Sequence, residues 1–229
     1  ALELFGMMLE RNLKPDVVTY NALIDGLCKD GDLEKAMELW DDMINKGIYP
    51  NQITYSILID SHCSKRHMDQ AFRLWDEMAG IGIQPNIVTY NSVIKGYCWS
   101  GDASKAEELL LKMSKDKVVP DRITYNTLIH GLVKEEKMRE AFALVSKMDG
   151  KGVTPDIITY NVLMNGFCEQ GNMREADLVF KRMVDQGIQP DSSTYTILMN
   201  GHIANENMKM AFQLHDEMLC RGFIPDDKF

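Results

Sequence analysis

Long apolar runs are absent from the sequence, which has no stretch of about 18 or more apolar residues, the length that crosses a bilayer as a helix. Hydrophobic residues make up 45% and charged residues 26% of its 229 residues. These shares are near the averages of soluble globular chains. We therefore expect a soluble chain with enough apolar residues for a sizeable core.

Cysteine and histidine are scarce, with five of each, and neither forms a reactive or metal-binding motif. The cysteines are odd in number and include no CxxC pair, which excludes a disulfide framework and favours a reducing compartment: Cys28, Cys63, Cys98, Cys168 and Cys220. No histidine has the HxxxH or HExxH spacing, and the HxE with PCxxC signature of zinc deaminases is missing. We expect no catalysis, no metal and no cofactor.

Basic residues are too few to balance the acidic ones, with 25 Lys and Arg against 34 Asp and Glu and a net charge of -9. This is the wrong sign for binding nucleic acid by phosphate neutralisation alone. The sequence begins at Ala1 without a charged leader before an apolar segment, so we expect any targeting peptide to lie outside it. Localisation does not follow from these residues.

Proline is also infrequent, but its positions reveal the organisation of the chain. All seven prolines are 35 residues apart, at Pro15, Pro50, Pro85, Pro120, Pro155, Pro190 and Pro225. Tyrosines keep the same interval from Tyr20 to Tyr195, and methionines keep it from Met8 to Met218. An unbroken period of this length is typical of a stacked repeat protein.

The period divides one solenoid domain into six whole repeats and a leading half. The repeats are 17–51, 52–86, 87–121, 122–156, 157–191 and 192–226. Residues 1–16 correspond to the second half of a preceding repeat, because Leu4, Phe5 and Met8 match Leu39, Trp40 and Met43 one period later. Residues 227–229 form a short tail.

Each repeat carries two helical patterns. In the first, which we name helix A, apolar residues fall on one helical face at Tyr20, Leu23, Ile24 and Leu27, and Thr19 is the expected N-cap. The β-branched residues around each tyrosine resemble strands, but the helical period continues through them. We predict helices here and no sheet.

The second pattern, helix B, is expected to begin at the cap Asp32 and to end at Gly47, before Pro50. Its apolar residues follow the same spacing, at Ala36, Leu39, Trp40 and Met43. Asn172 with Glu175 predicts a capping box in one repeat. Lys117 replaces the terminating glycine in another, and we expect that helix end to be less sharply defined.

Stacked neighbours must bury the apolar faces that one helix pair leaves open. A small residue recurs in every complete helix B, which suits close helix approach, at Ala36, Ala71, Ala106, Ala141, Ala176 and Ala211. We predict an all-α fold, a right-handed α-solenoid superhelix of thirteen helices. Trp40, Trp75 and the periodic methionines are expected in its core.

The repeat has the form V-T-Y-N-x-L-I-x-G-x-C, then A-x-x-L-x-x-x-M, then G-x-x-P-D. It resembles the pentatricopeptide repeat (PPR), in its plain 35-residue P-type class, over residues 1–226. The tetratricopeptide pattern of W-x-x-L-G-x-x-Y is absent. The resemblance implies binding of single-stranded RNA, one base per repeat, in a plant organelle, the mitochondrion ahead of the plastid.

In that family the base is read by the fifth residue of a repeat together with the last. The resemblance assigns these roles to the pairs Asn21 with Asn51, Ser56 with Asn86, Asn91 with Asp121, Asn126 with Asp156, Asn161 with Asp191, and Thr196 with Asp226. Their amides, hydroxyls and carboxylates can meet a Watson–Crick edge. The family's pairing rules imply the target 5′-CAUUUG-3′.

The resemblance also implies an apolar second residue that sandwiches bases and a lysine near the end of helix A that approaches phosphate. The second residues are Val18, Ile53, Val88, Ile123, Ile158 and Ser193, of which only Ser193 is not aliphatic. The lysine is present as Lys29 and Lys134, whereas Ser64, Trp99, Glu169 and Ala204 stand in the other repeats. We therefore expect affinity to depend more on stacking and base edges than on phosphate contacts.

Plainer interpretations stay open at these positions. An Asn near a helix start can serve only as a local backbone partner, and an Asp after proline can serve only as a cap. Variation between Asn, Ser and Thr at a fixed point of a constant scaffold favours base reading. The cysteines of helix A stand in separate repeats and are expected to be core thiols. A protein-interaction scaffold is the alternative function, favoured slightly by the acidic charge.

Overall fold

A computed structural model describes residues 2–224 of the chain, with side chains from residue 5 onward. Every regular element in that range is an α-helix, which confirms the prediction of an all-α fold with thirteen helices. The helices are α1 Leu2–Glu10, α2 Val17–Asp30, α3 Leu33–Asn45, α4 Gln52–Ser64, α5 Met68–Gly80, α6 Ile87–Trp99, α7 Ala103–Lys115, α8 Arg122–Lys134, α9 Met138–Gly150, α10 Ile157–Glu169, α11 Met173–Asp185, α12 Ser192–Ala204 and α13 Met208–Cys220.

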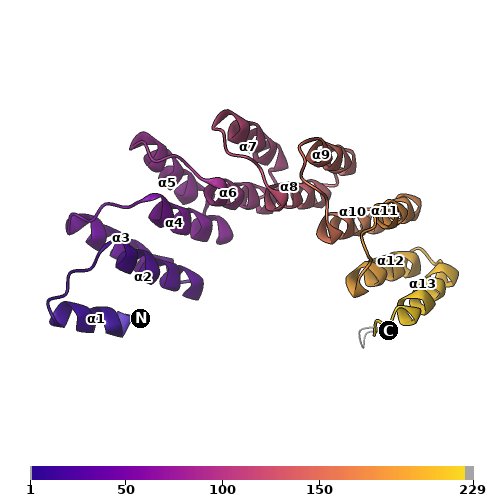
Figure 1. The fold of residues 1–229 in the computed structure, drawn as a ribbon, viewed down its shortest axis with the longest axis horizontal. Helices are drawn as coiled ribbons and strands as arrows, with labels where there is room; N and C mark the ends of the chain where they lie inside the picture. The colour runs from indigo at the N-terminus through magenta and orange to yellow at the C-terminus, as the bar shows by residue number, and fades with distance from the viewer. Residues whose placement is uncertain (1, 225–229) are drawn as a thin grey trace. The chain divides into compact units, whose positions relative to one another are not determined.

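The helices fall into two compact units, residues 1–120 and residues 121–229. In the N-terminal unit the A helices α2, α4 and α6 pack side by side, and each packs against the B helix that follows it (Figure 1). The C-terminal unit repeats this plan with α8, α10 and α12 as A helices and α9, α11 and α13 as B helices. Each unit is therefore a stack of helix pairs.

The residue directly after each proline is the N-cap of the next A helix, and the helix begins at the residue after that. Asp156, for example, is extended at φ -120° and ψ -177°, and its carboxylate accepts the Thr159 N–H at 3.1 Å. The Thr159 hydroxyl accepts the Asp156 N–H in return, which completes a capping box. The prediction that Thr19 is the N-cap is thus wrong. Asp16 caps α2, since a carboxylate is the better cap, and Thr19 fills the third helical position.

The B helices confirm two cap predictions and correct two others. Asp32 caps α3, and Gly47 follows it in the left-handed region at φ 73°. Lys117 takes the same conformation at φ 58°, and α7 ends in register with α3, so its end is no less defined than the others. The bond from the Val118 N–H to the Met113 carbonyl at 2.9 Å closes this end without glycine.

The capping box predicted for Asn172 and Glu175 is also wrong. Asn172 occupies the N-cap position of α11, but its side chain makes no cap hydrogen bond. The Asn172 amide instead donates to the Gln170 side chain at 3.4 Å. The preceding turn therefore supplies a competing partner for this side chain.

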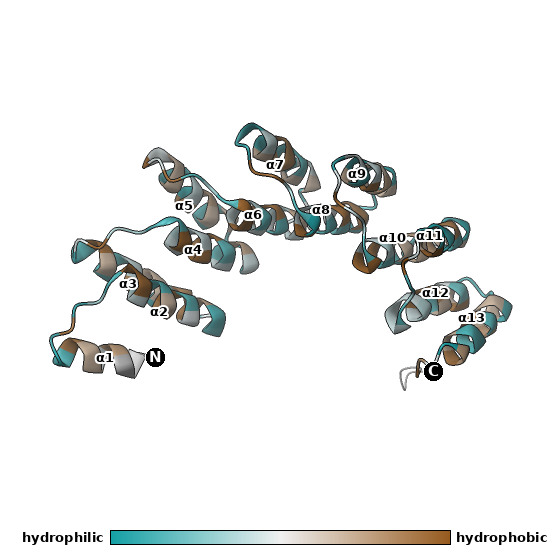
Figure 2. Ribbon diagram, viewed as in Figure 1, coloured by the Kyte–Doolittle hydropathy of each residue, from teal (hydrophilic) through white to brown (hydrophobic). Residues whose placement is uncertain are grey.

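The core lies between the helices of each unit, and Figure 2 shows hydrophobic and hydrophilic residues interspersed along them. The predicted face of α2 is buried, as are the helix B alanines, which are at most 5% exposed. The periodic tyrosines are buried at the ring, and five of the six are hydrogen-bonded at the hydroxyl, as Tyr195 is to Glu217 at 2.9 Å. Burial, aided by this hydrogen bond, raises the pKa of Tyr195 to about 12. The tyrosine thus links helix A to helix B within its repeat.

Candidate nucleic-acid interface

The fifth-position residues lie near the start of the A helices. Asn21 and Ser56 are each 7% exposed, and the other members are partly exposed. The last-position residue of each repeat is also the N-cap of the next A helix, as for Asn51, Asn86, Asp121, Asp156 and Asp191. Asp226 lies outside the described residues. Stacking of consecutive A helices therefore brings positions 30 residues apart in sequence to neighbouring helix starts.

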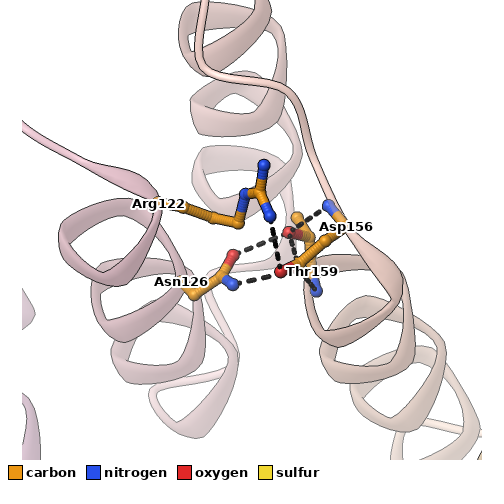
Figure 3. A network of polar contacts seen from close by, with 4 residues as sticks. All are labelled: Arg122, Asn126, Asp156 and Thr159. Carbon is orange, nitrogen blue, oxygen red and sulfur yellow. Dashed lines mark hydrogen bonds and ion pairs between the residues drawn. The ribbon is translucent and has the colours of Figure 1, made fainter.

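The fourth repeat shows how the two positions meet (Figure 3). The Asn126 amide on α8 donates to Asp156 Oδ1 at 3.2 Å, and its carbonyl oxygen accepts the Thr159 hydroxyl at 2.6 Å. Arg122, one turn before Asn126, places a guanidinium nitrogen 3.6 Å from Asp156 Oδ2. One acidic cap therefore joins the start of α10 to the surface of α8.

The fifth repeat has the same arrangement. The Asn161 amide donates to Asp191 Oδ1 at 3.4 Å, and Asn161 Oδ1 accepts the Thr194 hydroxyl at 2.8 Å. Hydrogen bonds of this kind also control the ionisation of the caps. Burial alone would raise the pKa of Asp156, but bonds from the Thr159 backbone, Asn126 and the Thr159 hydroxyl outweigh it and lower the pKa. Asp191 is shifted in the same direction by its equivalent bonds.

The first two repeats vary this arrangement. The Asn21 amide donates to Asn51 Oδ1 at 3.3 Å, but the buried Asn21 Oδ1 has no hydrogen-bond partner among the described residues. In the second repeat the Ser56 hydroxyl lies 2.7 Å from that of Thr89 and also donates to the Gln52 carbonyl at 2.8 Å. The fifth-position residues thus differ in which donors and acceptors their neighbours already use.

A pocket of about 490 Å³ lies beside Ser56 in the N-terminal unit. Its lining brings together predicted residues of every kind: the fifth-position Ser56, the last-position Asn86, the second-position Ile53 and Val88, and Lys29. Asp25 and Asp60, one turn beyond the fifth position, line it as well. Its volume falls in the range of small-ligand sites, roughly 300–1,000 Å³.

An equivalent pocket of about 380 Å³ lies beside Asn161 in the C-terminal unit. It is lined by the fifth-position Asn161, the last-position Asp191, the second-position Ile158 and Ser193, and Lys134. His130 and Asn165 occupy the places that Asp25 and Asp60 hold in the other unit. The fold therefore gathers the sequence-predicted residue types at corresponding points of both units.

The second-position residues are exposed despite their apolar character. Val18, Ile53, Val88, Ile123 and Ile158 are 55–67% exposed, and Ser193 is also exposed. Aliphatic side chains at a regular interval on a polar surface are available for contact with flat apolar groups. These residues do not contribute to the core.

The two predicted phosphate lysines have different surroundings. The Lys29 ammonium forms an ion pair with Asp25 one turn earlier on α2. Lys134 has His130 at that position of α8, where burial followed by the positive charge of Lys134 lowers the pKa of His130. Lys29 is thus already paired with a carboxylate, and both lysines are exposed.

The two remaining pairs are described by their individual members, because one has its residues in different units and the other has a residue outside the described range. Asn91 lies on α6 in the N-terminal unit, and Asp121 caps α8 in the C-terminal unit. The Thr196 hydroxyl donates to the Ser192 carbonyl at 2.9 Å, a local bond within α12. Its expected partner, Asp226, is outside the described range.

Sequence reasoning missed the threonine that follows each cap by three residues. Its hydroxyl contacts the cap and, in three repeats, the preceding fifth-position residue. The signal was present, because the residue recurs with the 35-residue period from Thr19 to Thr194. The residues one turn beyond the fifth position, such as Asp25 and His130, were also missed.

Two further findings concern the described part of the chain. No helix there is long and apolar enough to span a membrane. No group of three or more His, Cys, Asp and Glu side chains there could hold a metal ion. The cysteines are free, and burial raises the pKa of Cys63 to about 12.

The stacked helix pairs with a regular series of polar pairs define a helical-repeat protein. The PPR repeat family model matches the chain in seven segments, 1–29, 15–64, 57–98, 85–134, 120–169, 155–204 and 194–228. The chain therefore belongs to the pentatricopeptide-repeat family. A search of curated protein sequences finds no match.

Solved structures give the same answer for the fold. The crystal structure of the pentatricopeptide repeat protein PPR10 from maize is 27% identical with a TM-score of 0.74, over 99% of this chain and 37% of that one. PPR10 in complex with an 18-nt psaJ RNA element is 26% identical with a TM-score of 0.70, over 99% and 38%. The chain thus spans little more than a third of the length of PPR10.

A third structure is similar in fold alone. It is the PPR domain of Arabidopsis thaliana protein-only RNase P 1 in complex with tRNA, 22% identical with a TM-score of 0.61. The similarity covers 74% of this chain and 89% of that domain.

Proposed function

We propose that this chain binds single-stranded RNA, one base per repeat, with the target 5′-CAUUUG-3′. The observation that carries the proposal is the pair of equivalent pockets, in which a fifth-position residue, a last-position residue, exposed second-position residues and a lysine converge. Polar groups at the floor suit a base edge, and the aliphatic side chains suit its faces. PPR10, which is similar over nearly the whole chain, was crystallised with RNA.

The proposed mode of action is occupancy. A bound array would shield its RNA segment from nucleases or change its folding, which are roles in RNA processing and stability. We place this action in an organelle of a plant cell, the mitochondrion or the plastid, on the family resemblance. Catalysis is not part of the proposal, because occupancy needs only groups that bind a base.

A protein-interaction scaffold is the second candidate, and the net charge of -9 favours it. A solenoid can present its surface to a peptide, and an acidic surface repels phosphate. The pairs of Asn, Ser or Thr with Asp or Asn favour RNA, because a peptide surface does not need such a pair at every repeat.

The two candidates separate in one titration. RNA containing CAUUUG is compared with a scrambled RNA of equal composition, at fixed salt because phosphate contacts are salt-dependent. Tighter binding of CAUUUG supports base reading. Equal affinity for the two RNAs would remove sequence reading, and no binding to either would favour the scaffold.

A further inference from the structure

The threonine that follows each helix A cap by three residues is buried in repeats two to six. Thr54, Thr89, Thr124, Thr159 and Thr194 are all 0% exposed. A threonine hydroxyl shielded from water needs its hydrogen bonds within the protein. In repeats three, five and six these bonds include the fifth-position residue of the preceding repeat.

The bonding around Thr159 fixes the direction of its hydroxyl proton. The hydroxyl oxygen accepts the Asp156 N–H at 3.1 Å, so its own proton is available to an acceptor. The shorter of its two acceptor contacts is to Asn126 Oδ1 at 2.6 Å, against 3.0 Å to Asp156 Oδ1. Thr159 therefore acts as a donor toward the Asn126 amide.

A donor on one side and a carboxylate on the other select one orientation of the Asn126 amide. The two ends of an amide have the same shape, and only the hydrogen-bond partners distinguish them. Oδ1 faces the Thr159 hydroxyl and Nδ2 faces Asp156 Oδ1 at 3.2 Å. A flipped amide would set Nδ2 against a donor and Oδ1 against a carboxylate.

We propose that this threonine is a positioning residue, which selects the amide end that the fifth-position asparagine offers to a base; this inference rests on the proposed RNA binding. The orientation leaves the second Nδ2 proton of Asn126 for the ligand, beside Asp156 Oδ2, which can accept a further hydrogen bond although Arg122 lies 3.6 Å from it. Uracil presents a carbonyl acceptor beside an N–H donor, which complements this set. Cytosine presents an amino donor beside a ring acceptor, which does not.

The first repeat is a natural comparison. The Thr54 hydroxyl donates to the cap Asn51 at 3.1 Å, and Asn21 Oδ1 has no partner among the described residues. Its amide lacks the bond that fixes Asn126. The first repeat should therefore discriminate less sharply between U and C than the fourth.

The test replaces Thr159 in the whole chain and measures binding of four RNAs, CAUNUG with each base at N. Thr159→Val keeps the shape and removes the hydroxyl. We expect the ratio of U to C affinity at the fourth base to fall about five-fold, the change that one net hydrogen bond gives. Thr159→Ser should restore the ratio.

Thr19→Val is the matched control. Thr19 makes the same capping box with Asp16, and its hydroxyl bonds in this chain are to Asp16 alone. The Thr19→Val variant should lower stability as Thr159→Val does and leave the base preference at the fourth position of the RNA unchanged. An undiminished U to C ratio in Thr159→Val overturns the positioning role, and so does an equal loss in Thr19→Val.

A wild-type chain without any preference at the fourth base would instead refute the proposed function. The positioning contact then has its own test in a double-mutant cycle of Asn126→Ala and Thr159→Val on equilibrium unfolding. A coupling of about five-fold in the unfolding constant is expected. The pair Asn126→Ala and Thr19→Val should show none, and absence of coupling in the first pair overturns the contact.

Discussion

The pockets of the two units are the same site three repeat periods apart, with different contents. Ile53 and Lys29 of the N-terminal pocket are matched by Ile158 and Lys134 of the C-terminal pocket. The polar pair differs, with Ser56 and Asn86 in one and Asn161 and Asp191 in the other.

The residues one turn further along also differ, Asp25 and Asp60 against His130 and Asn165. The isoleucine and the lysine are thus constant, while Ser193 replaces Val88 and the hydrogen-bonding groups and charges vary. The comparison teaches that the scaffold and the recognition groups of a repeat can change independently.

The largest expected effect tests how far the scaffolds of the two units are interchangeable. A Cβ atom on Gly166 would lie 2.5 Å from Val133 Cγ1 and 2.8 Å from the Met138 sulfur. The matching residues of the N-terminal unit are Ser61 and Cys28, whose side chains share a hydrogen bond. Gly166→Ser should therefore lower the unfolding free energy by about 3 kcal/mol, the upper end of the overpacking range.

Denaturant unfolding measures this loss, and Val133→Cys in the same chain is the control. The smaller thiol should restore part of the stability, because it recreates the pair of the N-terminal unit. Unchanged stability of Gly166→Ser would mean that the two helix interfaces tolerate the same side chains and that our comparison overstates their difference.

The second prediction exchanges the polar pairs. Ser56→Asn with Asn86→Asp should move the preference at the second base from A to U, and Asn161→Ser with Asp191→Asn should move the fifth base from U to A. A change of about 1–3 kcal/mol is expected for one good base contact exchanged. Titration with RNAs varied at single positions measures both shifts.

Preference at the other bases is the internal control for this exchange. It should stay as in the wild type, because separate repeats contact separate bases. An equal loss of affinity for every RNA would identify the pairs as structural residues and remove the CAUUUG assignment.

The third prediction concerns His62, a buried histidine of the N-terminal unit that the repeat three periods later lacks. His62 is 6% exposed, and Phe167 occupies the matching place in the C-terminal unit. Burial lowers the pKa of His62, with a smaller contribution from His67. The unfolded chain, with a histidine pKa of about 6.5, binds more protons than the folded one below that pH.

The stability that neutral His62 contributes is therefore complete above about pH 6.5 and is lost as pH falls through its folded pKa. His62→Phe should make Tm less sensitive to acid between about pH 7.5 and 5, each unit of pKa difference being worth about 1.4 kcal/mol. The exposed His67→Gln is the control and should keep most of the acid sensitivity. If Tm falls with acid as much in His62→Phe as in the wild type, His62 is not the source of the acid sensitivity.

The smallest expected effect is on RNA affinity and distinguishes the two predicted phosphate lysines, Lys29 and Lys134. Asp25→Asn frees Lys29 from its ion pair and should strengthen RNA binding slightly, because an exposed pair contributes little. The slope of log affinity against log salt should steepen by about 0.7, the value for one phosphate on a single strand. Lys29→Ala in the same chain should cancel both changes.

Lys134→Ala should cost more affinity than Lys29→Ala in the otherwise native chain. The reverse order would show that pairing with Asp25 does not weaken Lys29 as a phosphate ligand.

The period made the helices and the core predictable, because the apolar spacing of Tyr20, Leu23 and Ile24 leaves one buried face. The cap of helix A was assigned three residues too late, since Asp16 and Thr19 both suit an N-cap and the difference in their preference is small beside the effect of the backbone conformation. The contact of Asn126 with Thr159 could not be predicted from spacing. It depends on stacked helices and on the rotamers of two side chains from different repeats.

One consequence follows from the cap at the start of each A helix. A residue such as Asp156 accepts the Thr159 N–H as an N-cap, and any contact with a ligand must be compatible with that bond. Asn, Asp, Ser and Thr have a side-chain oxygen that accepts this bond, glycine is tolerated as a cap without accepting it, and other residues cost about 1 kcal/mol of stability. The residue types that suit this position are therefore those that favour the start of a helix. An array of such repeats can therefore acquire a new target without loss of stability only if the new residue at this position also caps a helix.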